Sequence, residues 1–75
     1  LCEIALAVLK PGERAELRTG LHLLYAPDGM VTGDAGSQAF AVEVGDALRI
    51  ESDAPSRLSI TDGSALLATI IRRDA

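Results

Sequence analysis

The single histidine of the chain, His22, carries the side chain best suited to proton transfer or metal binding. It stands near the start of an apolar segment that spans residues 21–26. One histidine and one cysteine, Cys2, fall short of the roughly four ligands that a structural metal site needs. We therefore expect no metal and no other cofactor. The simplest role for His22 is structural, with its ring bonded to a loop carbonyl group or to water, and a ligand-binding role is the alternative.

Few other side chains could work with His22 in catalysis. Tyr25 and Glu43 are the only plausible partners for general acid–base chemistry. The alternation of side chains along a strand places His22 and Tyr25 on opposite faces, which argues against their cooperation. Ser56 could act as a nucleophile with His22 as its base, but no Gly-x-Ser-x-Gly turn surrounds it. Cys2 lies on an apolar segment and is typical of a small buried hydrophobic residue.

Three arginines, Arg18, Arg49 and Arg57, lie on or beside predicted strands. A guanidinium group can bind a carboxylate or phosphate through two hydrogen bonds. Loose surface pairing with neighbouring carboxylates is the simpler expectation, and such pairs contribute about 0–1 kcal/mol each. No catalytic residue is predicted, and the candidate ligand-binding residues are Arg18, His22, Tyr25 and Ser56.

Composition narrows the function further. The chain of 75 residues has a net charge of −4, so it repels nucleic-acid phosphates, and it has no basic stripe with interleaved aromatic residues. No apolar run approaches the roughly 20 residues of a membrane-spanning helix, and residues 4–9 lack the charged flank of a signal peptide. One cysteine suits a reducing compartment, so a cytoplasmic protein is expected. We expect one domain over residues 1–75, without a nucleic-acid or membrane partner.

Short apolar runs separated by turn residues predict an all-β barrel or sandwich of about seven to eight strands. The first and last strands are expected at residues 2–9 and 65–72, and others at 15–18, 21–26, 38–44 and 47–51, and around Leu58 and Ile60. Residues 33–37 are expected to be the most flexible stretch, and Asp62-Gly63 to form a hairpin turn. The predicted core consists of Ile4, Leu6, Val8, Leu23 or Leu24, Phe40, Val42, Leu48, Ile50, Leu58, Ile60, Leu67 and Ile71.

Two segments resemble the turns that open the two sequence motifs of the cupin superfamily. Residues 45–50, Gly-Asp-Ala-Leu-Arg-Ile, resemble the start of the second motif, and residues 10–13, Lys-Pro-Gly-Glu, resemble the Pro-Gly turn of the first. Gly29 resembles the glycine that ends the first motif. Among cupins, the pattern is most similar to the ligand-poor halves of pirin-like proteins and of the HutD/Ves-like group. The resemblance implies a single small antiparallel jelly roll.

The positions that match the metal ligands of cupins hold other residues here. Arg18 and Gly20 occupy the two histidine positions of the first motif, and Ser56 occupies the histidine position of the second. No acidic residue between residues 21 and 27 supplies the glutamate. The resemblance therefore implies a degenerate cupin barrel without a metal. Such a barrel is more typical of a module that binds a small organic ligand, or of an association module, than of an enzyme.

Two other functions stay open at this point. A metal-independent, isomerase-like cupin enzyme would use His22 in the barrel. A biotinyl- or lipoyl-like domain would present a lysine at a hairpin tip, and Lys10 is the only lysine, although it lacks the expected flanking residues.

The last predicted strand is apolar on both faces, with Leu66 and Ile70 against Leu67 and Ile71. One face can fill a barrel, but the other would lie in water in a monomer. A chain this short also gains from burying more surface than it can bury alone. We therefore expect a homodimer through the terminal strands, broken by a charge at whichever of Leu66 and Leu67 points outward. The alternative is that a second barrel of the same protein covers this surface.

Overall fold

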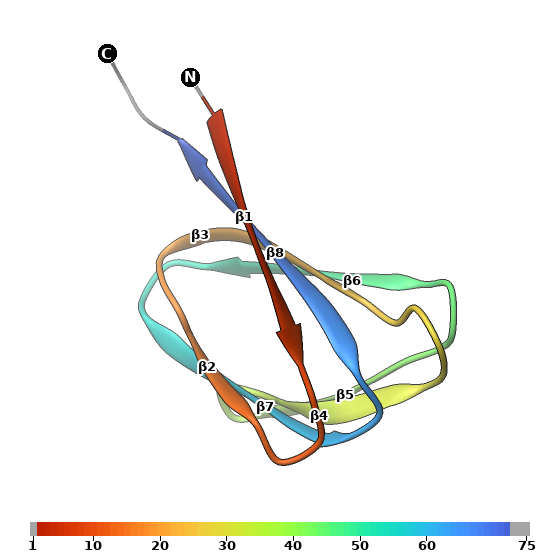
Figure 1. Cartoon of the computed structure of the whole chain (residues 1–75). Coiled ribbons are helices and arrows are strands. Elements are labelled where there is room, and N and C mark those ends of the chain that lie inside the picture. Colours follow the sequence, from red (N-terminus) through yellow and green to blue (C-terminus); the bar gives the residue numbers. More distant parts are fainter. Residues whose placement is uncertain (1, 73–75) are drawn as a thin grey trace.

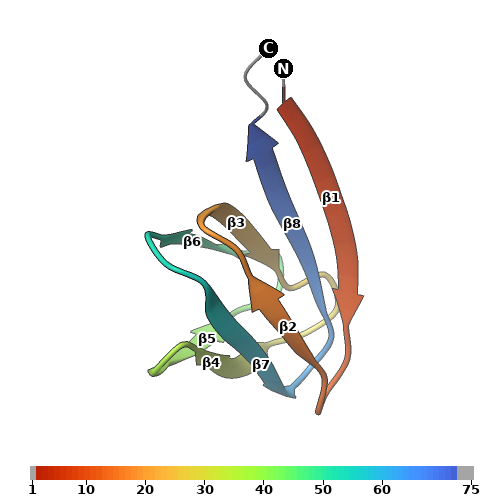
Figure 2. The same ribbon diagram turned by 90° about the vertical axis from the view of Figure 1, so that its left-hand side faces the viewer.

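The computed structural model describes residues 2–72 of the chain, with the side chains of residues 3–71. Eight antiparallel strands form two four-stranded sheets that face each other (Figures 1 and 2). Sheet A has the order β1-β8-β3-β6, and sheet B has the order β2-β7-β4-β5. The strands are β1 (Cys2–Leu9), β2 (Arg14–Leu17), β3 (Gly20–Tyr25), β4 (Val31–Ala35), β5 (Gln38–Val42), β6 (Ala47–Ser52), β7 (Ser56–Asp62) and β8 (Ala65–Arg72).

The strand order is that of a jelly roll, because the chain changes sheets at almost every connection. Only β4 and β5, joined through Gly36 and Ser37, are consecutive strands that pair with each other. The predicted all-β jelly roll is therefore confirmed, as are the bounds of β1 and β8. Residues 2–72 contain no helix long and apolar enough to cross a membrane.

Two local predictions are wrong. Residues 33–37 do not form a connecting loop, because β4 continues to Ala35 and only Gly36 and Ser37 form the turn. Asp62-Gly63 is not a hairpin turn, because β7 and β8 belong to different sheets. Gly63 (φ 79°) lies so close to Met30 that a side chain at position 63 would overlap the Met30 carbonyl oxygen. This connection therefore requires glycine for its backbone angle and for the space, as it passes from sheet B to sheet A.

The core lies between the inner faces of the two sheets. Leu24, Leu58, Ile60, Val42 and Leu67 are buried, as predicted. Phe40, Leu48 and Ile50 are half-buried and pack against this cluster. The core also includes residues that the prediction omitted, namely Leu9, Leu17, Ala26, Val31 and Ala65.

Ile4, Leu6 and Val8 were predicted to be core residues, and this prediction is wrong. Their exposed fractions are 66%, 65% and 64%. They lie opposite Ile70, Ala68 and Leu66 of β8, and side chains directly opposite in an antiparallel pair share a face. Because Leu67 is buried inside the barrel, that shared face is the outer face of sheet A. The small side chains of Ala5 and Ala7 therefore point to the inner side, where they too are exposed.

The outer faces of the two sheets differ in character. On sheet A, the strands β1, β8 and β3 present aliphatic side chains and one tyrosine, while the outer face of sheet B is largely polar. On β1, β8 and β3, the outward residues are Ile4, Leu6, Val8, Leu66, Ala68, Ile70, Leu21, Leu23 and Tyr25. The outward residues of sheet B are Arg14, Glu16, Arg57, Ser59, Thr61, Thr32, Asp34, Ala39 and Ala41. In a monomer, the first set would expose a continuous apolar surface to water.

Candidate functional site

His22 is buried near the start of β3, with 1% of its surface exposed. Its Nε2 lies 2.8 Å from the carbonyl oxygen of Arg18, and its Nδ1 lies 3.0 Å from the hydroxyl oxygen of Thr69 on β8. A carbonyl oxygen only accepts hydrogen bonds, so Nε2 must carry a proton and donate it. In the neutral ring, Nδ1 then accepts a hydrogen bond from Thr69. The Nδ1 hydrogen bond therefore joins β3 to β8, and the Nε2 hydrogen bond joins β3 to the connection that follows β2.

This arrangement matches the structural role expected for His22. A metal ligand or a general base needs a ring nitrogen with a free lone pair that faces a substrate. Here the only lone pair in the neutral ring faces the Thr69 hydroxyl. The geometry favours stabilisation of the fold over chemistry.

The structural role of His22 can be tested by replacing it with leucine, which fills a similar space without polar atoms. We expect His22→Leu to lower the free energy of unfolding by about 2 kcal/mol, because the Arg18 carbonyl group and the Thr69 hydroxyl group lose their shared partner. Urea unfolding followed by circular dichroism measures the change. The His22→Gln variant is the control, since its amide can keep one of the two hydrogen bonds and should lose less. Unchanged stability in His22→Leu would contradict a structural role.

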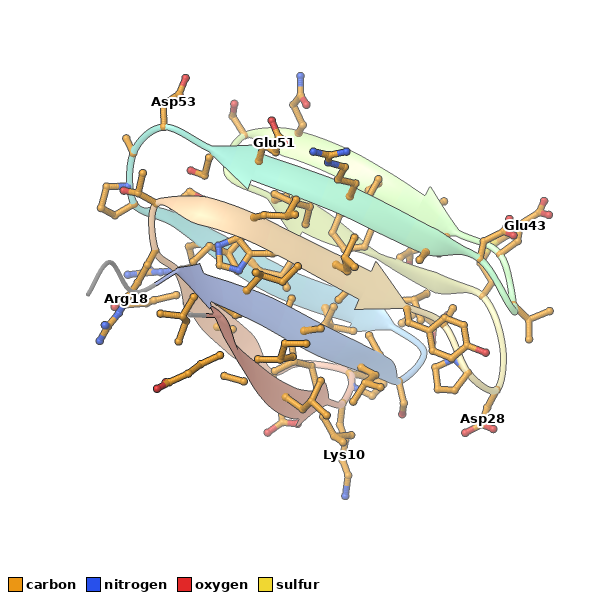
Figure 3. All side chains as sticks on the ribbon, turned by 90° about the horizontal axis from the view of Figure 1, so that it is seen from above. Lys10, Arg18, Asp28, Glu43, Glu51 and Asp53 are labelled. Atoms are coloured by element: carbon orange, nitrogen blue, oxygen red, sulfur yellow. The ribbon has the colours of Figure 1, made fainter. Side chains whose placement is uncertain are left out.

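The backbone carbonyl group of Arg18, rather than its guanidinium group, contacts His22. Its side chain is exposed beyond the end of β2, and Figure 3 shows Arg18 and Asp53 at one end of the barrel. An open depression of about 1000 Å³ at this end is lined by both, together with His22 and Thr69. Leu21 and Ile70 from the outer face also line it, so the depression wraps around the end of sheet A and is not an enclosed chamber.

The other candidate residues lie elsewhere. Tyr25 is on the outer face of sheet A with 39% of its surface exposed, and His22 points to the inner face, as strand alternation predicted. Figure 3 places Glu43 with Asp28 at the end of the barrel away from Arg18. The structure therefore separates His22 from both of its possible acid–base partners.

Ser56 lines a second opening, a cleft of about 530 Å³ between the free edges of β5 and β6. Its floor contains the half-buried side chains of Phe40, Leu48 and Ile50. Ser56 opens β7 opposite Leu17, and both ring nitrogens of His22 are bonded to other groups. A serine–histidine pair is therefore not assembled, and the four candidates Arg18, His22, Tyr25 and Ser56 do not converge on one pocket.

The charged side chains behave as a solvated surface. Arg49 forms an ion pair with Glu51 on the outer face of β6, with side chains 67% and 63% exposed. Arg57 is exposed on the outer face of sheet B, opposite Glu16. Within residues 3–71, no cluster of three or more histidine, cysteine or acidic side chains is arranged to hold a metal ion. The side chain of Cys2 lies outside the described residues.

Lys10 lies in the connection between β1 and β2, where its backbone N–H donates a hydrogen bond of 2.7 Å to the Glu13 side chain. These two strands belong to different sheets, so Lys10 is not at the tip of a hairpin. The lipoyl-like alternative therefore lacks the presentation it requires.

Neither a scan of protein-family models nor a search of curated proteins finds a match to this chain. Functional inference rests on the molecule itself. Its most unusual feature is the exposed aliphatic row on β1, which the sequence prediction assigned to the core. The signal was present in the alternation of large residues with Ala5 and Ala7, but the pattern alone does not say which face points inward.

Proposed function

We propose that the chain is a non-catalytic, cupin-like association module that binds a second copy of itself through its terminal strands. The observation that carries this proposal is the row of Ile4, Leu6 and Val8, each about two-thirds exposed on the outer face of sheet A. Together with the outward residues of β8 it forms what we call the terminal-strand surface: Ile4, Leu6, Val8, Leu66, Ala68 and Ile70.

The apolar character of the terminal-strand surface supports an association role. Apolar patches of more than a few hundred Å² on soluble proteins usually mark an interaction site. Burial of apolar surface contributes about 25 cal/mol per Å² before the costs of association are subtracted. Leu66 is the outward member of its pair and Leu67 is 5% exposed inside the barrel. The outer face of sheet A therefore offers apolar contact that the chain itself leaves uncovered.

Charge favours a second copy as the occupant. Two identical chains with a net charge of −4 repel each other, and the repulsion is smallest when the surfaces in contact carry no charge. Within residues 3–71, the terminal-strand surface has no charged side chain, and the outward charged residues of sheet A are the paired Arg49 and Glu51 on β6. Two copies can thus meet here without bringing like charges together.

The degenerate cupin motifs are consistent with this proposal, since the positions of the family's metal ligands hold Arg18, Gly20 and Ser56. A metal-independent enzyme that uses His22 is the alternative. The two bonded ring nitrogens of His22 and its separation from Tyr25 count against it.

Light scattering at micromolar concentration tests the proposal. We expect the unmodified chain to have twice the mass of one chain, and Leu6→Glu to dissociate it. Burying an unpaired carboxylate from each copy costs several kcal/mol, so the dissociation constant should rise by about 100-fold or more. Because Leu6 is exposed in the single chain, the variant should keep the circular dichroism of the parent.

Ala41→Glu provides a matched control, because it adds the same charge to an exposed position on the outer face of sheet B. It should remain dimeric. A monomeric parent chain, or a Leu6→Glu variant that associates as tightly as the parent, would disprove the proposal.

A further inference from the structure

The strand β1 has one free edge along its whole length. It pairs with β8 through residues 2–9, and no other strand within residues 2–72 adjoins it. Natural proteins usually protect such an edge with proline, lysine, glycine bulges or inward charges, because its N–H and C=O groups can pair with another strand. Residues 2–9 contain none of these except Glu3, near one end. The free edge of β1 can therefore pair with another strand.

The outward side chains of β1 are more exposed than those of the central strands β8 and β3. Leu66, Leu21 and Leu23 point to the same outer face as the β1 row, yet they are half-buried. They have neighbouring strands on both sides, whereas β1 has one only on the β8 side. A further strand alongside β1 would therefore bring Ile4, Leu6 and Val8 to the exposure of their counterparts on β8 and β3.

We propose that β1 pairs antiparallel with β1 of the second copy around a two-fold axis, with Leu6 opposite Leu6, so that the two A sheets join into one continuous sheet. This inference rests on the proposed function, because it specifies how the two copies meet: pairing covers the edge of β1 and the flanks of its outward row, while the outer face of β8 keeps the exposure that it has in one chain. Self-pairing needs no other protein, since an antiparallel strand pair is compatible with two-fold symmetry.

The register follows from the side chains. Residues directly opposite each other share a face, so the outward row continues across the axis only if even-numbered residues meet even-numbered residues. With Leu6 at the centre, Ile4 lies opposite Val8 of the partner subunit, and all three outward aliphatic residues are matched. Centring on Ala5 would place Val8 opposite Cys2 of the partner subunit, and centring on Ala7 would place Ile4 opposite Lys10 of the partner subunit.

The same register separates the charges at the strand ends. Glu3 lies opposite Leu9 of the partner subunit, six residues from Glu3 of the partner subunit. At about 3.4 Å per residue, the two Glu3 residues are about 20 Å apart along the strands, beyond the screening length at physiological salt. The pairing therefore incurs little like-charge repulsion.

The shape of the molecule accommodates this arrangement. Figures 1 and 2 show β1 and β8 running side by side beyond the other strands, as a two-stranded ribbon that projects from the body. With Leu6 at the centre, the projecting start of each β1 lies beside residues 8–10 of the other copy, where β1 joins the body. Each ribbon is thus placed alongside the partner rather than in solvent.

Disulfide trapping tests the register in a Cys2→Ser background, which removes the chain's own thiol. We expect Leu6→Cys to cross-link with itself under mild oxidation, because opposite residues in an antiparallel pair have Cβ atoms about 4.5–5.5 Å apart. Ile4→Cys alone should not cross-link, since its two copies would be separated by four residues, about 13 Å along the strand. A mixture of Ile4→Cys and Val8→Cys should form the mixed disulfide.

Light scattering of the same reduced variants separates the possible failures. A dimer in which Leu6→Cys does not cross-link would overturn the strand pairing and leave association itself standing. A dimer trapped more readily by Ile4→Cys than by Leu6→Cys would overturn the register. A monomer would overturn both the pairing and the proposed function.

Discussion

Replacing Gly33 by alanine should destabilise the jelly roll by about 3–4 kcal/mol, close to the limit that a chain of this size can tolerate. Gly33 is buried in β4, where it faces Ile60 of β7 and Phe40 of β5 across the sheet. A Cβ atom there would overlap the backbone carbonyl oxygen of Ser59 and press against the tip of the Phe40 ring. Phe40 could shift, but Ser59 belongs to the paired strand β7, so the conflict can be relieved only by moving backbone.

The strand register explains the close approach at this site. The register of β4 against β7 shifts between Thr32 and Gly33, next to the point where the Ser59 carbonyl oxygen lies close to Gly33. Urea unfolding, compared with that of Gly29→Ala, measures the effect. Gly29 has open space around it, so its alanine variant should change the free energy of unfolding by less than about 0.5 kcal/mol. Equal stabilities for the two variants would show that the backbones at Gly33 are farther apart than described.

Truncation of Leu58 to alanine should cost about 3 kcal/mol. Leu58 is fully buried on the inner face of β7, between Ala15 of β2 and Ala35 of β4. Its two strand neighbours on that face are already small, so they cannot expand into the space left by the removed methyl groups. The cost therefore combines the lost apolar burial with an unfilled cavity.

The matched control for Leu58→Ala is Val44→Ala, which truncates an aliphatic side chain that is 59% exposed and should cost less than about 0.5 kcal/mol. Both variants should be compared by thermal and urea unfolding at the same chain concentration, because association also stabilises the folded state. A loss below about 1 kcal/mol for Leu58→Ala would mean that the two sheets can close over the gap.

The location of strands followed from local signals. Alternating apolar residues and turn residues predicted about seven to eight strands and matched both ends of β1 and β8, although they assigned most of β4 to a flexible stretch. Alternation also placed His22 and Tyr25 on opposite faces, as observed. These predictions succeeded because period-2 geometry and turn chemistry act over a few neighbouring residues.

The sequence predicted the candidate site less well than it predicted the strands. The motif positions suggested a set of residues around a barrel interior, but Arg18 and Tyr25 are on the surface and Ser56 lines a different opening from His22. The partner of His22 could not be read from the chain either, since Thr69 is 47 residues away. The cupin resemblance thus located turns and strands without assembling a site.

The sequence by itself determined the β content, the strand and turn positions, the lack of a second histidine and the excess of apolar residues. Only the tertiary structure decided which face of β1 points outward and which connections change sheets. Ile4, Leu6 and Val8 look like core residues because they alternate with small ones, yet the buried side of sheet A is defined by Leu24 and Leu67 across the register. Which face of a strand is buried depends on the sheet that packs against it. That sheet is formed by residues far away in the chain, so a local pattern does not reveal the buried face.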